Sequence, residues 1–197
     1  MKKALMTIIL AVFAFTQTQA QITFKPGIRA GVNFSHFTQG DYYNAYDSNY
    51  SPAYRNDFNS KTDFYAGFYG ALHLTKYYTL QPEIDYSRQG SAIVNNGIKS
   101  QFDVSYLSIA VANKFTFDKF NIHLGPTIDF VVEKNYSVNS DVDFAFFLGA
   151  GYNFTPNFGI EGRVKKGIIP VIDNNNFDNS HTNVVFSLGA TYTFDVN

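Results

Sequence analysis

Apolar residues alternate with small or polar residues along much of this 197-residue sequence. The clearest example is the run 184–194, whose even positions are all apolar and whose odd positions are mostly Ser, Gly and Thr. Strict alternation puts the two kinds of side chain on opposite faces of a β-strand. The apolar face is rich in aromatic residues, as is typical of a strand that faces lipid. The pattern therefore predicts membrane-spanning β-strands.

The same alternation recurs in seven more segments, so the sequence predicts eight strands. They cover residues 23–37, 63–75, 78–88, 103–117, 120–132, 144–154, 158–165 and 184–194. Short turns at 76–78, 118–119 and 155–157 alternate with long connections at 38–62, 89–102, 133–141 and 168–182. Because hydrocarbon offers no partner to unpaired backbone groups, the sheet must close on itself. We expect an all-β fold, an eight-stranded antiparallel transmembrane β-barrel with short periplasmic turns and longer extracellular loops.

Residue pairing across the turns supports these hairpins. A two-residue turn at 118–119 pairs Phe117 with Phe120, Phe115 with Ile122, and Lys114 with His123. Pro82 and Pro126 fall inside strands and are interpreted as local irregularities or bulges. Aromatic residues beside the short turns and at the C-terminal strand end should form one girdle at the membrane interface. They are Tyr77, Tyr78, Phe117, Phe120, Phe154, Phe158 and Phe194.

The N-terminus indicates export. Lys2 and Lys3 precede an apolar run at 4–15, and Thr18 and Ala20 supply small residues for cleavage. This pattern predicts a secretory signal peptide at residues 1–20, too short to span a membrane as a helix. The alternative is a buried helix of the mature fold. The barrel domain would then occupy residues 21–197, without cysteines and so without disulfides.

Location and partners follow from these features. An even number of strands leaves both termini on the periplasmic side of the outer membrane. The expected partners are outer-membrane lipid, the barrel-assembly machinery and an extracellular ligand bound through the loops, with the protein acting as a monomer. The chain has 15 basic and 16 acidic residues and no basic run, which argues against nucleic-acid binding.

The non-lipid faces of the strands carry charged residues that would meet in the lumen. An eight-stranded barrel is narrow enough for side chains to fill its interior. We predict an ion-paired network of Arg29, Glu83, Asp85, Lys114, His123, Asp129, Glu161, Arg163 and Lys165. The prediction centres the network on Lys114, paired with Glu83, and leaves His123 neutral beside that cation. The alternative is a water-filled lumen in which these side chains are separately solvated.

Motifs for catalysis are missing from the sequence. It has no G-x-S-x-G, H-E-x-x-H or P-loop, and its four histidines lie in separate segments. Ser35 and His36 are neighbours, but adjacent strand residues point to opposite faces, which disfavours a lipid hydrolase. We therefore expect no enzymatic activity, no cofactor and no metal site. The Asp- and Asn-rich run 173–179 could offer oxygen ligands to Ca²⁺, but it lacks the Gly and terminal Glu of a calcium-binding loop. Because Asn and Asp favour turns, a solvated loop is the preferred interpretation.

The long connection 38–62 is rich in tyrosine among small polar residues. Its tyrosines are Tyr42, Tyr43, Tyr46, Tyr50 and Tyr54. Such a composition suits a binding surface, because tyrosine offers contact area at low entropy cost. The alternative is a loop whose tyrosines pack against one another and against the other loops.

The end of the chain resembles the C-terminal β-signal by which outer-membrane barrels are recognised for insertion. The matching residues are Ser187, Gly189, Tyr192 and Phe194, although three residues follow the final Phe. The tracts 27–35, 80–90 and 106–111 resemble the porin-like or PorT-like outer-membrane β-barrel family common in Bacteroidetes. This resemblance covers nearly all of the mature chain. It implies the fold, whereas the porin label implies little about conduction.

The leading functional hypothesis is a small non-enzymatic outer-membrane barrel with an envelope, structural or surface-interaction role through its loops. A narrow solute channel is the alternative, and a lipid-modifying enzyme is less favoured. A soluble lipocalin-like binder would turn its aromatic face inward, opposite to the lipid-facing interpretation.

Overall fold

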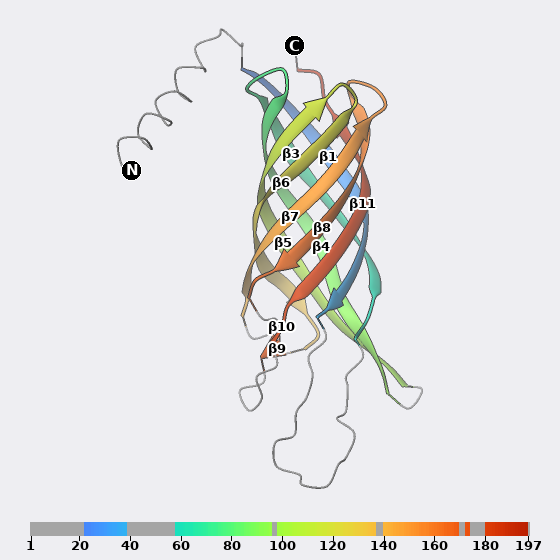
Figure 1. Ribbon diagram of the computed structural model, residues 1–197. Helices are drawn as coiled ribbons and strands as arrows, with labels where there is room; N and C mark the ends of the chain where they lie inside the picture. The colour runs from blue at the N-terminus through green and yellow to red at the C-terminus, as the bar shows by residue number, and fades with distance from the viewer. Residues whose placement is uncertain are drawn as a thin grey trace, which may run out of the picture.

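The protein folds into a β-barrel whose three short turns lie at the same end (Figure 1). The computed structural model describes residues 22–38, 58–95, 98–136, 140–169, 172–173 and 180–196. The barrel strands are β1 (Thr23–Phe37), β3 (Lys61–His73), β4 (Tyr78–Asn95), β5 (Ile98–Phe117), β6 (Phe120–Lys134), β7 (Val142–Asn153), β8 (Phe158–Gly167) and β11 (Asn183–Thr193). No helix in these ranges has the length and apolar character needed to cross a membrane.

The eight barrel strands form a closed antiparallel ring. Each strand pairs with its neighbour in the chain, and β1 pairs with β11 to close the ring. Three two-residue strands complete the set: β2 (Phe58–Asn59) extends the sheet beside β4, while β9 (Ile172–Asp173) and β10 (Ser180–His181) pair with each other. The prediction of an all-β, eight-stranded antiparallel barrel is confirmed.

The two faces of the barrel wall have opposite chemistry. Large apolar side chains are exposed on the outside, as in β6, where every second residue from Phe120 to Phe130 except Pro126 is an exposed large hydrophobic. The residues between them point inward and are buried, among them Asn121, His123 and Asp129. A water-soluble protein would bury the first set and expose the second. The inverted arrangement fits a wall with lipid outside and polar groups inside.

The three short turns close the hairpins between β3 and β4, β5 and β6, and β7 and β8. The predicted pairing across 118–119 is confirmed at all three positions, with Phe117 opposite Phe120. The turn between β3 and β4 begins earlier than predicted, because the Thr75 hydroxyl accepts the backbone N–H groups of Tyr77 and Tyr78. Thr155 makes the same two contacts in the turn between β7 and β8. In both turns a threonine hydroxyl takes the place of a backbone acceptor and ends the preceding strand.

The connection predicted at 89–102 is wrong. Strands β4 and β5 continue beyond it as a regular hairpin, paired residue by residue to Asn95 and Ile98. In Figure 1 this green hairpin projects past the other strands at the loop end. Alternation of apolar and polar residues is required only where one face meets lipid, so its loss marks the end of the membrane span and not the end of the strand. Gly90, with φ of 145°, supplies a backbone conformation that other residues rarely adopt.

Pro82 and Pro126 interrupt the hydrogen-bonded ladder without shifting the register. Pro82 lies at a two-pair gap between β3 and β4, and Pro126 lies at a similar gap between β5 and β6. The pairs on either side of each gap keep the same register, because proline removes only its own donor. The prediction of local irregularity is confirmed, but the bulge lies elsewhere, between Ser105 and Tyr106 of β5.

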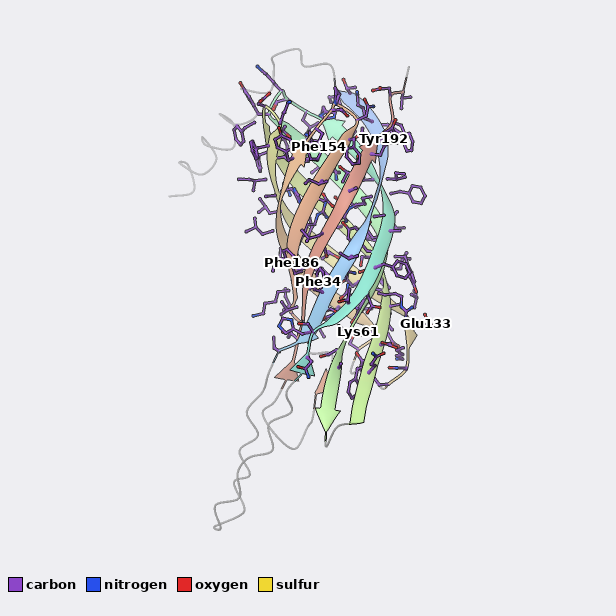
Figure 2. The ribbon with its side chains drawn as sticks, turned by 90° about the vertical axis from the view of Figure 1, so that its right-hand side faces the viewer. Phe34, Lys61, Glu133, Phe154, Phe186 and Tyr192 are labelled. Atoms are coloured by element: carbon purple, nitrogen blue, oxygen red, sulfur yellow. The ribbon has the colours of Figure 1, made fainter. Side chains whose placement is uncertain are left out.

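The aromatic residues predicted as a girdle all lie at the turn end. Tyr77 stacks on Phe117 with ring centroids 6.2 Å apart, and Phe154 stacks on Phe158 at 5.9 Å. Figure 2 shows Phe154 and Tyr192 near this end and Phe34 and Phe186 nearer the other. Phe34 and Phe186 stack on each other at 6.2 Å. Aromatic rings therefore border the apolar band on both sides, as at two membrane interfaces.

Candidate functional site in the barrel lumen

A layer of ion-paired side chains crosses the lumen near the middle of the barrel. It is formed by Arg29 of β1, Glu83 and Asp85 of β4, and Glu161 and Arg163 of β8. In the ring of eight strands, β4 and β8 lie four strands apart and thus on opposite walls. The ion pair between Arg163 and Glu83 therefore spans the full diameter of the lumen. We call these five residues the plug.

The contacts within the plug are short and mostly double. Arg163 donates from Nη1 to Glu83 Oε2 at 2.6 Å and from Nη2 to Glu83 Oε1 at 2.8 Å. Arg29 donates from Nη2 to Glu161 Oε1 at 2.5 Å and from Nη1 to Asp85 Oδ2 at 2.6 Å. All five side chains are buried. Charges withdrawn from water are tolerated in this way, when each is paired and hydrogen-bonded.

Aromatic rings and glycines hold the two guanidinium groups in place. Arg29 lies 4.7 Å over the ring of Tyr65, and Arg163 lies 4.7 Å over the ring of Phe147. Gly149 faces inward, where a Cβ atom would collide with His123 and Arg163. The missing side chain at Gly149 thus makes room for the plug.

His123 joins the plug to β6, on the wall opposite β1. Arg163 Nε lies 3.0 Å from His123 Nε2, a contact in which this ring nitrogen acts as the acceptor. Nδ1 lies 3.0 Å from Asn121 Oδ1 and is the nitrogen left to donate. These contacts fit a neutral imidazole with its proton on Nδ1. The neutral state of His123 stays a prediction.

Lys114 is not the centre of the network, which is a correction to the prediction. No ion pair joins Lys114 to Glu83, or to any other residue in the described parts of the chain. The neighbour of Glu83 on β5 is Ala110, whereas Lys114 is paired with Thr79. The two side chains are four residues apart along the strands, about 13 Å. Lys114 and Glu83 lie at similar distances in sequence from a short turn, which is why the sequence predicted that they meet. Arg29 and Arg163 form the centre of the network instead.

Two further groups fill the lumen on the loop side of the plug. Lys165 forms an ion pair with Asp129, whose Oδ1 also accepts from Thr127 at 2.6 Å. Asn33 donates to Ser87 Oγ at 3.0 Å and accepts from Ser187 Oγ at 2.7 Å. Between these groups and the plug lies a cavity of about 50 Å³. Alternation places Asn33 on the inward face of β1, but the predicted network, which was limited to charged residues and His123, does not include it.

A wider cavity of about 390 Å³ opens at the turn end, on the other side of the plug. Lys25, His73, Lys76 and Lys114 line it together with Thr, Asn and Gln side chains. Lys25 Nζ forms an ion pair with Asp195 Oδ1 at 2.9 Å, and Asp195 is not among the residues that line the cavity. This contact and that from Asn157 lower the pKa of Asp195. We call this cavity the vestibule.

The predicted assembly-signal residues lie on both faces of β11 and just beyond it. Ser187 and Gly189 face the lumen, whereas Tyr192 and Phe194 are exposed on the outside. The rings of Tyr192 and Phe194 meet edge to face at 5.3 Å. The Phe194 N–H also bonds Pro26 O at 2.8 Å, which extends the closing seam between β1 and β11. An exposed aromatic pair on the seam strand is well placed for recognition.

Phe194→Ala should lower the yield of membrane-inserted barrel more than Phe186→Ala does. Both residues are exposed phenylalanines of the same seam, but only Phe194 belongs to the predicted signal. The measurement is the fraction of heat-modifiable, folded protein in outer-membrane preparations. Equal yields for the two variants would contradict an internal signal at 187–194.

The other residues considered as candidate sites either form no site within the described residues or lie outside them. Ser35 is buried and its Oγ accepts the Gly90 N–H at 2.9 Å, while His36 lies on the opposite face of β1. Tyr42, Tyr43, Tyr46, Tyr50 and Tyr54 lie outside the described residues, as do the signal peptide and most of the run 173–179. In the described ranges, no cluster of three His, Cys, Asp or Glu side chains is arranged to hold a metal ion.

Comparison with known proteins agrees with this architecture. Residues 15–173 match the sequence model of the family described as outer membrane protein beta-barrel domain. Neisserial surface protein A matches with a TM-score of 0.55 and 12% identity, over 86% of this chain and 97% of its own. Ail of Yersinia pestis, in complex with the heparin analogue sucrose octasulfate, matches with a TM-score of 0.51 and 14% identity, over 87% of this chain and 99% of its own. At this identity the likeness shows the fold alone. No curated protein sequence matches significantly.

Proposed function

The chain belongs to the outer membrane protein beta-barrel domain family, and we propose that it is a closed, non-enzymatic member that serves the cell envelope or surface interactions through its loops. The observation that carries the proposal is the plug. Arg163 of β8 and Glu83 of β4 join opposite walls, and Arg29 and Glu161 complete the layer. A solute could pass only by breaking several buried ion pairs, each costly to separate. A barrel closed in this way would act through the connections at the end opposite the short turns.

Orientation and partners are part of the proposal. The short turns, the start of β1 and the end of β11 lie at the same end of the barrel (Figure 1), which supports periplasmic termini and extracellular loops. The five tyrosines in 38–62 support a surface contact made at the loop end. The barrel would act as a monomer surrounded by lipid, after insertion by the assembly machinery and removal of residues 1–20. The motif tracts 27–35, 80–90 and 106–111 support the porin-like Bacteroidetes type.

The wild-type protein should produce no discrete current steps in planar lipid bilayers, because the plug blocks the ion path. The measurement is single-channel conductance of the mature protein in 1 M KCl, with a general porin as positive control. Reproducible steps from wild-type protein would favour the alternative of a narrow solute channel.

The surface role has a separate test. A variant with all five tyrosines of 38–62 changed to serine should fold normally, because these residues lie outside the barrel strands. Cells displaying it should lose adhesion to host-cell or matrix surfaces that the wild type binds. Unchanged adhesion would exclude these tyrosines as the binding surface.

A further inference from the structure

The vestibule at the turn end has an unusual charge distribution for a barrel interior. Three lysines and one histidine line it, from β1, β3, β5 and the turn between β3 and β4. None of the described residues that line it is acidic. A concave site with one sign of charge and low-dielectric walls concentrates ions of the opposite sign. Its volume of about 390 Å³ leaves room for a polyatomic anion and several waters.

Lys114 differs from the other charged residues of the lumen. Of the eight charged side chains predicted for the lumen, seven have an oppositely charged partner within 4 Å in the described chain, and Lys114 has none. Its side chain lines the vestibule on the turn side of the plug. A partly buried ammonium group without a direct ion pair is costly, and a bound anion would supply one.

The other groups of the vestibule complement this charge. Lys76 lies on the exposed turn at the mouth, 5.3 Å over the ring of Tyr77, and has no carboxylate partner in the described ranges. Lys25 is already neutralised by Asp195. Thr116 adds a hydroxyl to the lining. The Thr79 hydroxyl is bonded to His73 Nδ1 at 2.9 Å, and the Asn157 amide already donates to Thr193 O and Asp195 Oδ2. Two ammonium groups that form no ion pair within 4 Å in the described chain, with a hydroxyl nearby, suit a small oxyanion such as phosphate.

From these observations we infer that the vestibule is a binding site for a small oxyanion of the phosphate class, held by Lys114 and Lys76 and entered from the turn end. The plug forms the floor of the site, so the anion enters and leaves by the same mouth. This site is distinct from the loop-end contact proposed above and does not depend on it.

The test is calorimetric titration of the mature, refolded protein with inorganic phosphate, at constant ionic strength in NaCl and in zwitterionic micelles. The wild type should bind one phosphate saturably. Lys114→Met should weaken the affinity at least tenfold, and Lys114→Arg should retain most of it. Lys119→Met is the matched control, because Lys119 is an exposed lysine of a turn at the same end that does not line the vestibule.

Lys76→Met keeps the test valid if Lys114→Met fails to fold, since Lys76 lies on an exposed turn, and it should weaken binding several-fold. Absence of saturable binding, or equal losses from Lys114→Met and Lys119→Met, would overturn the inference. Repeating the titration in phosphatidylcholine and in phosphatidylglycerol bilayers distinguishes binding of free phosphate from binding of a lipid headgroup. Loss of phosphate binding when phosphatidylglycerol replaces phosphatidylcholine would assign the lysines to lipid and would also overturn it.

Discussion

Glu83→Gln should lower the free energy of unfolding by about 3–5 kcal/mol, the usual cost of removing one partner from a buried ion pair. The Glu83 carboxylate accepts from Arg163 at 2.6 and 2.8 Å, from Arg29 at 3.0 Å and from Gln81 at 2.8 Å. Glutamine keeps the shape of the side chain but removes the charge between two arginines. The two buried guanidinium groups then share fewer counter-charges. Urea titration of the protein in lipid vesicles, followed by circular dichroism, measures the change.

Glu133→Gln is the control for this experiment. Glu133 is exposed near the loop end of β6, and its hydrogen bond from Ser105 is long, at 3.4 Å. Surface substitutions of this kind change stability by about 0.5 kcal/mol or less. If Glu83→Gln costs no more than Glu133→Gln, the plug is not a stabilising layer, and the lumen is better described as separately solvated charges.

Leu148→Arg should lower the free energy of unfolding in bilayers by about 2–4 kcal/mol, the cost of an arginine on the lipid face near the membrane midplane. Leu148 lies in the middle of β7, with Leu124 and Val164 beside it on the neighbouring strands. Its side chain is 60% exposed, and the structure places it on the outside of the wall. The same unfolding titration in vesicles measures the effect.

Val196→Arg is the matched control, because Val196 is also exposed, at 61%, but lies beyond the last barrel strand. Outside the hydrocarbon band the arginine remains hydrated, so the expected change is within about 0.5 kcal/mol. Equal costs for the two arginines would mean that Leu148 does not face hydrocarbon. The assignment of the exposed aromatic face to lipid would then be wrong.

Alternation along the chain was sufficient to predict which way most residues face. The side-chain direction in a strand depends only on local geometry, with a period of two residues. The sequence therefore indicated that Glu83, Asp129 and Arg163 lie inside and that Phe120, Phe146 and Leu148 lie outside. The short hairpin at 118–119 was also predictable, because a two-residue turn sets the register of its own strands.

The sequence could not predict how far the strands extend beyond the membrane. Residues 89–95 and 98–102 lack the lipid-facing alternation, and nothing local distinguishes them from a loop. They form a hairpin because each backbone group finds a partner on the facing strand. Such pairing depends on two segments at once and leaves no pattern in either alone.

The partners of the lumen charges were decided by the tertiary structure. The sequence by itself determined an eight-stranded barrel with balanced charges inside, since period and composition are local properties. Which charges meet depends on the register accumulated around the closed ring. That register brings Arg163 to Glu83 across the lumen and leaves Lys114 four residues short of it. A shift of two residues in the pairing of two strands would leave every side chain on the same face of the sheet. It would change which charged residues meet, because the face of a residue depends on its own strand, whereas its depth in the lumen depends on the pairing between strands.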